Sequence, residues 1–145
     1  MSFNWSSYLH LAQELGGRAD EAARRSAISR AYYYAFHVAN DHLKANRVRL
    51  DLERSVHERV WRVYIKSSNP QCVKIGTDGY RLKVARRDAD YIPDRHPTNS
   101  LVQRSLLEAG TIVAAVPVHL PEGFIPKPTN RFRDFVKCVK KLFSA

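Results

Sequence analysis

The chain has 145 residues, of which 44% are hydrophobic, and 24 Lys and Arg against 14 Asp and Glu give it a formal net charge of +10. This length and apolar share predict one globular domain with a core of its own. No apolar run approaches the roughly 20 residues of a membrane span, and the first ten residues lack the pattern of a signal peptide. The two cysteines, Cys72 and Cys138, are far apart in the sequence, which argues against a disulfide framework or a zinc site. We therefore expect a cytoplasmic protein with no membrane partner.

The basic charge favours a polyanionic partner and carries no information about the fold. Nucleic acid is the usual partner of such a surface, and an acidic protein is the main competitor. A basic surface that only keeps the protein in solution is the third interpretation.

Two helices are predicted in the first 45 residues. The first spans apolar residues at helical spacing from Trp5 to Leu15 and is stopped by Gly16-Gly17. The second begins near Asp20-Glu21, where acidic residues suit a helix N-terminus, and runs to about Ala45.

The middle of the chain predicts two further helices. A third apolar stripe comprises Leu52, Val56, Val60 and Val63, and the run from Ser67 to Pro70 ends this helix. Residues 70–79 are expected to form a loop. Thr77 or Asp78 then caps a helix that ends at Tyr91-Ile92, before Pro93.

The last third predicts one more helix and an extension. Ser100 with Gln103 forms a capping box for a helix to about Val116. The prolines from Pro117 to Pro128 predict an extended linker, and an amphipathic helix follows from Phe132 to Phe143. We expect an all-α antiparallel bundle of about five helices over residues 1–116, with residues 117–145 packed on the same domain.

The predicted second helix carries two stripes. The apolar stripe contains Ile28, Ala31, Tyr32, Ala35, Ala39 and Leu43. The other contains Ser26, Arg30, Tyr33, His37 and Asn40. Arg30 and His37 are seven residues apart and so share a face. A guanidinium and an imidazole suit phosphate chemistry, because one holds anionic oxygens and the other exchanges a proton near neutral pH. Alternatively, Arg30 pairs with Asp88 or Asp90 inside the bundle and His37 packs half-buried.

Two segments resemble the signatures of the HEPN domains, a family of small all-helical proteins. SAISRAYYYAFHVA, residues 26–39, is similar to the family's signature helix, and RLKVARRDADY, Arg81 to Tyr91, is similar to its second signature. The two occur in the family's order, and the predicted helix layout matches from about Trp5 to Val116.

The resemblance implies a metal-independent endoribonuclease of the toxin or defence type that needs no cofactor. HEPN ribonucleases use an Arg separated from a His by four to six residues, and Arg30 and His37, with six residues between them, meet that spacing. In those enzymes the motif lies on a later helix, where this chain has Arg87 but no His before His96. His37 or His96 would then move the proton, and Arg30 or Arg87 would stabilise the phosphorane.

Further candidates for RNA or phosphate binding follow from charge and aromatic content. Arg87 and Tyr91 are one turn apart, with Arg86, Asp88 and Asp90 beside them, so this group either holds a phosphate and a base or forms an internal ion-pair network. Tyr33 suits base stacking or packing against a second copy.

The predicted C-terminal helix is basic and amphipathic. Such a helix binds nucleic acid, an acidic membrane surface or a partner groove, or it docks on its own domain with the basic side outward, the arrangement we favour. Its cations are Arg131, Arg133, Lys137, Lys140 and Lys141.

Two hypotheses of different classes remain. One is a ribonuclease that acts on RNA, and the other is a non-catalytic HEPN-fold module that binds RNA, a nucleotide or a protein. In either case the resemblance implies a homodimer, and for the toxin type it implies a nucleotidyltransferase antitoxin as a possible partner.

Overall fold

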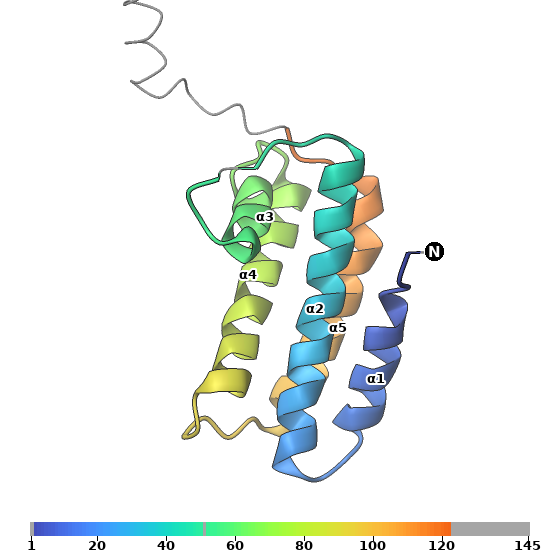
Figure 1. The fold of residues 1–145 in the computed structure, drawn as a ribbon, viewed down its shortest axis with the longest axis vertical. Coiled ribbons are helices and arrows are strands. Elements are labelled where there is room, and N and C mark those ends of the chain that lie inside the picture. The colour runs from blue at the N-terminus through green and yellow to red at the C-terminus, as the bar shows by residue number, and fades with distance from the viewer. Residues whose placement is uncertain (1, 51, 123–145) are drawn as a thin grey trace, which may run out of the picture.

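The computed structural model describes residues 2–50 and 52–122, which form an all-helical bundle without strands (Figure 1). The helices are α1 (Ser6–Gly16), α2 (Glu21–Ala45), α3 (Val56–Ile65), α4 (Pro70–Tyr91) and α5 (Asn99–Ala115), followed by the 3-10 helix η1 (Val116–Val118). Helices α1, α4 and α5 all pack on α2, and α3 packs mainly on α4, so α2 is the central helix. The prediction of an all-α bundle of about five helices is confirmed.

The central helix α2 begins where the sequence predicts. The Asp20 side chain accepts a hydrogen bond of 2.9 Å from the backbone N–H of Ala23, and Glu21 adds negative charge to the first turn. The predicted apolar stripe is fully buried, at Ile28, Ala31, Tyr32, Ala35, Ala39 and Leu43.

The predicted loop over residues 70–79 is wrong, because α4 begins at Pro70. Asn69 caps it by accepting a 2.9 Å hydrogen bond from the backbone N–H of Gln71. Proline is well suited to the first turn of a helix, where a backbone N–H has no partner. The residues that end α3 therefore also start α4, and neither Thr77 nor Asp78 is a cap.

Gly76 and Gly79 lie inside α4 and bring it close to α3. A Cβ on Gly79 would lie 2.2 Å from Cε3 of Trp61, and one on Gly76 would lie 2.6 Å from the backbone nitrogen of Ile65. These glycines are therefore contact positions between two helices, although in the sequence they resemble turn residues.

Two other helix starts also differ from the prediction. α3 begins after its cap Ser55, so Leu52 lies outside the helix and is 83% exposed. α5 is capped by Thr98, whose side chain accepts from a backbone N–H of the first turn at 3.1 Å, in place of the predicted pair Ser100 and Gln103. In both cases the side chain that accepts a hydrogen bond from a backbone N–H of the first turn, not the apolar spacing, defines the start.

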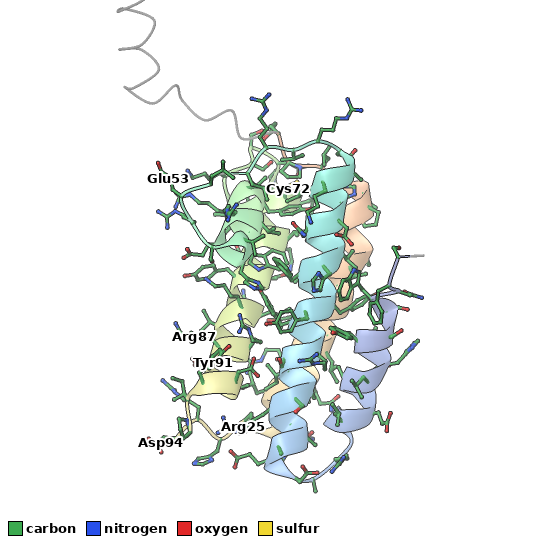
Figure 2. All side chains as sticks on the ribbon, viewed as in Figure 1. Arg25, Glu53, Cys72, Arg87, Tyr91 and Asp94 are labelled. Carbon is green, nitrogen blue, oxygen red and sulfur yellow. The ribbon has the colours of Figure 1, made fainter. Side chains whose placement is uncertain are left out.

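Arg25 fastens the end of α4 to the start of α2. Figure 2 shows Arg25 near the loop that carries Asp94. Its guanidinium donates hydrogen bonds of 2.7 to 3.1 Å to four backbone carbonyls, those of Ala89, Ile92, Pro93 and Arg95. Its Nε also donates to Glu21 at 2.8 Å. The last carbonyls of α4 and the loop after it thus gain a cationic partner.

The chain after η1 stays on the bundle as far as Glu122. Pro121 is buried, and the Glu122 carboxylate accepts 3.0 Å hydrogen bonds from the Ser67 hydroxyl and the Ser68 backbone N–H. Hydrogen bonds from Ser68 and Ser67 lower the pKa of Glu122 to about 2. The first part of the predicted linker is therefore packed, while residues 123–145, with Cys138 and the predicted basic helix, lie outside the described residues.

One described stretch, Asn99–Val118, is long and apolar enough to cross a membrane, judged by length and composition alone, with a mean hydropathy of 1.3. The prediction that no stretch approaches this length is wrong for α5. A core helix passes the same test, and α5 packs on α2 and α4 through buried Val102, Ala109 and Ile112.

Candidate functional site

One face of α2 gathers the predicted Arg30, Tyr33 and His37 with two side chains from other helices. His57 comes from α3 and Arg86 from α4. We call these five residues the basic aromatic face. Arg86 is 8% exposed, and the other four are half-buried.

Arg30 is surrounded by aromatic rings. Its guanidinium carbon lies 5.0 Å from the centre of the Tyr8 ring and 5.5 Å from that of Tyr33. No carboxylate of residues 2–50 or 52–122 forms an ion pair with it, so the expected pairing with Asp88 or Asp90 is absent there. Arg30 therefore keeps its charge available to an external anion.

His37 packs against α1. Its ring stacks on Trp5 with centroids 3.5 Å apart and planes within 4°, and Trp5 donates a 3.1 Å hydrogen bond to Asp41. Burial, opposed by the nearby Asp41 carboxylate, lowers the pKa of His37 below 6.5, so the neutral imidazole prevails at pH 7. The half-buried position matches one of the two predicted interpretations.

Arg30 and His37 do not touch. Seven residues of helix separate them by about 10 Å along the axis. Tyr33 lies between them, with its ring 5.5 Å from the Arg30 guanidinium and 6.1 Å from the His37 ring. A ligand would therefore have to extend across Tyr33 to reach both.

Arg86 is the most deeply buried cation in the described part of the chain. Its guanidinium lies 5.2 to 5.9 Å from the rings of Tyr32, Tyr33 and Tyr91. Its ion pair with Asp90 is long, at 3.7 Å, and its buried Nε has no hydrogen-bond partner. A buried charge with such weak pairing favours an anion nearby.

Asp90 thus pairs with Arg86 and not with Arg30. It also accepts a 3.2 Å hydrogen bond from Ser29 on α2. The predicted ion-pair network therefore runs along α4, and Ser29 joins it to the central helix.

His57 belongs to this face but was not singled out by the sequence. The Trp61 indole donates to the Tyr32 hydroxyl at 3.3 Å, and this hydroxyl lies 2.8 Å from Nδ1 of His57. The Tyr32 hydroxyl, which accepts from Trp61, can donate its own proton to Nδ1, and in this arrangement the neutral His57 carries its proton on Nε2. Burial, with Arg86 and Lys83 nearby, lowers the pKa of His57 below 6.5.

Two of the predicted residues, Arg87 and His96, lie elsewhere. Arg87 is exposed and pairs with the adjacent Asp88 at 3.0 Å, and Figure 2 shows Arg87 and Tyr91 on the outer side of α4. His96 lies in the loop before α5 and contacts Glu21 at 3.1 Å, at the first turn of α2. Neither Arg87 nor His96 joins Arg30 and His37.

The five predicted cations between Arg131 and Lys141 lie outside the described residues. Within the described ranges, no group of three or more His, Cys, Asp and Glu side chains is arranged to hold a metal ion. Comparison with protein-family models, with curated proteins and with solved structures finds no match to this chain.

Proposed function

We propose that this domain binds single-stranded RNA on the basic aromatic face. In this arrangement Arg30 and Arg86 contact phosphates and Tyr33 stacks on a base. The observation that carries the proposal is the incomplete charge pairing of Arg86, which is buried with one long carboxylate contact and an unpartnered Nε.

The position of Tyr33 supports a polymer ligand. Two guanidinium groups lie close to its ring, with the central carbon of Arg30 at 5.5 Å and that of Arg86 at 5.4 Å from the ring centre. Proteins that bind single strands combine basic side chains along the backbone path with aromatic rings for the bases. The resemblance to HEPN domains adds RNA as the expected polyanion.

Salt-dependent binding to a labelled oligouridylate tests the proposal. Each phosphate contact contributes about one unit to the slope of log affinity against log salt concentration. Arg30→Ala should reduce this slope by about one unit. Tyr33→Leu should weaken binding by about 1–3 kcal/mol and leave the slope unchanged.

Arg49→Ala is the matched control, because Arg49 is an exposed cation in the segment after α2. It should change affinity little. Equal losses from Arg30→Ala and Arg49→Ala would show diffuse attraction to the whole basic surface and would overturn the assignment of this face.

Metal-independent cleavage of the bound RNA is the second candidate, favoured by two imidazoles on the face. Both have lowered pKa values, and neither ring nitrogen of His37 is hydrogen-bonded within the described residues. His37 can therefore accept a proton from a ribose 2′-hydroxyl, while Nε2–H of His57 donates a hydrogen bond to a phosphate oxygen.

In this reaction the 2′-oxygen forms a bond to phosphorus as the bond to the 5′-oxygen breaks. His37 takes the hydroxyl proton, and water protonates the leaving oxygen. The product is a 2′,3′-cyclic phosphate, formed in EDTA as well. Loss of cleavage in His37→Gln with retained RNA binding would support this candidate. If the unaltered protein leaves the RNA intact, cleavage is excluded and RNA binding remains as the function.

Self-association is also part of the proposal. A groove between α1 and α5 includes Leu9, Leu106 and Leu107, and Leu107 is 71% exposed. An apolar side chain this exposed suits a contact with the same face of a second copy. Light scattering should give a dimer mass, and Leu107→Glu should give the monomer. A nucleotidyltransferase partner is proposed from the family resemblance alone.

A further inference from the structure

A second candidate site lies on the other side of α4, between α4, α5 and the loop of residues 92–98. It is a pocket of about 350 Å³, near the lower end of the range for small-molecule sites. Its floor is aliphatic, formed by Ile28, Val84, Ala85, Ala89 and Leu101. Figure 1 places this loop at the opposite end of the bundle from residues 119–122, so the described end of the chain does not cover the pocket.

The loop wall of the pocket is held in place by charged groups. Arg25 binds the carbonyls of Ile92, Pro93 and Arg95, and Glu21 binds both Arg25 and His96. A carboxylate only accepts hydrogen bonds, so Nδ1 of His96 carries the proton and Nε2 is the nitrogen left for another partner. A wall fixed in this way reduces the ordering cost of binding.

Among the described residues, the rim of the pocket has one charge without an ion-pair partner, and it is positive. The other charged or ionisable groups at the rim are paired: Arg81 with Asp78 at 3.3 Å and Glu108 at 2.9 Å, Asp88 with Arg87 at 3.0 Å, and His96 with Glu21 at 3.1 Å. Arg95 has no carboxylate partner among the described residues, and Arg25 fixes its backbone carbonyl. The pocket therefore combines an aliphatic floor with a cation at its mouth.

We propose that this pocket binds a small aliphatic carboxylate, with the hydrocarbon on the floor and the carboxylate at Arg95. Arg95 supplies the charge, and a guanidinium binds a carboxylate through two parallel hydrogen bonds. This inference is independent of the proposed RNA-binding face.

Titration of the full chain with octanoate, followed by ¹H–¹⁵N NMR, tests the proposal. Millimolar octanoate should shift signals of residues 84–89 and 95–101. Octanol and octylamine should bind at least tenfold more weakly, because they lack the negative charge. Hexanoate should bind up to about fourfold more weakly for each CH₂ group removed, since a buried methylene contributes about 0.8 kcal/mol.

Arg95→Ala should weaken octanoate binding at least tenfold, and Arg49→Ala, which removes the same charge at the other end of the bundle, should leave it unchanged. Ala85→Leu fills the floor and should abolish binding; its melting temperature shows whether the fold is retained. Equal binding of octanoate and octanol, or signal shifts only outside the pocket, would overturn the proposal. Both results are obtained with the unaltered protein, so they do not depend on whether a variant folds.

Discussion

The basic aromatic face and the rim of the α4–α5 pocket use the same residue types in opposite ways. On the face, Arg30 and Arg86 lie over tyrosine rings, and a tyrosine hydroxyl orients His57. At the rim, Arg81 meets two carboxylates, and Glu21 orients His96. Aromatic rings stabilise a cation without neutralising it. Charge count alone therefore does not locate a polyanion site in this protein, because a cation in close contact with carboxylates, such as Arg81, is already neutralised.

The largest expected effect lies on the pocket side, in Arg25→Ala. This change removes the donor for four carbonyls and leaves Glu21 without its cation, so we expect a loss of about 2–4 kcal/mol in the free energy of unfolding. Urea denaturation measures it. Arg87→Ala is the matched control, because its exposed pair with Asp88 should contribute less than about 1 kcal/mol. Similar losses from both variants would contradict the role of Arg25.

On the face, Tyr32→Phe should have an intermediate effect. It leaves the Trp61 indole N–H buried without its acceptor and frees Nδ1 of His57, so we expect a loss of about 1–3 kcal/mol. NMR should also show that the neutral His57 no longer keeps its proton on Nε2 alone. A single Nε2–H tautomer in Tyr32→Phe would show that Tyr32 does not orient the ring.

The smallest effects are expected in the pH dependence of stability, which should separate the two regions. The folded pKa of His57 lies below 6.5, so the unfolded chain binds the proton first and stability falls as the pH drops through 6.5 toward the folded value. Hydrogen bonds from Arg25 and His96 hold the pKa of Glu21 below 4.5, so its contribution is lost only below that pH.

Thermal melts at closely spaced pH values check this separation. His57→Gln should reduce the fall in stability just below pH 6.5, to which His37 also contributes. Glu21→Gln should change only the fall in stability below pH 4.5. If the fall in stability just below pH 6.5 is the same in His57→Gln as in the unaltered protein, His57 has the same proton affinity in the folded and unfolded chain.

Local signals predicted the central helix well. Asp20 caps α2, and the period of apolar residues from Ile28 to Leu43 identifies its buried side. The start of α4 could not be predicted in this way. Gly76 and Gly79 are glycines because Ile65 and Trp61 of α3 pack directly against them and leave no room for a side chain. Glycine looks the same in a sequence whether it bends a chain or admits a neighbour.

The candidate site shows the same division. The shared face of Arg30 and His37 follows from helical spacing, but the contact of His57 with Tyr32 joins residues 25 apart through packing of two helices. The burial of Arg86 depends on which side of α4 meets α2, and the α4 sequence carries no dominant apolar stripe that indicates this side. Its neighbour Arg87, with the same side chain, is exposed.

The contacts of Arg25 also have a consequence for folding kinetics. They join residues 64 to 70 positions apart, so they form only after the chain between them has closed into a loop and α2 and α4 have met. Such contacts are expected to be absent from much of the transition state. Arg25 would then act mainly on the rate of unfolding and slow the opening of the bundle at this end.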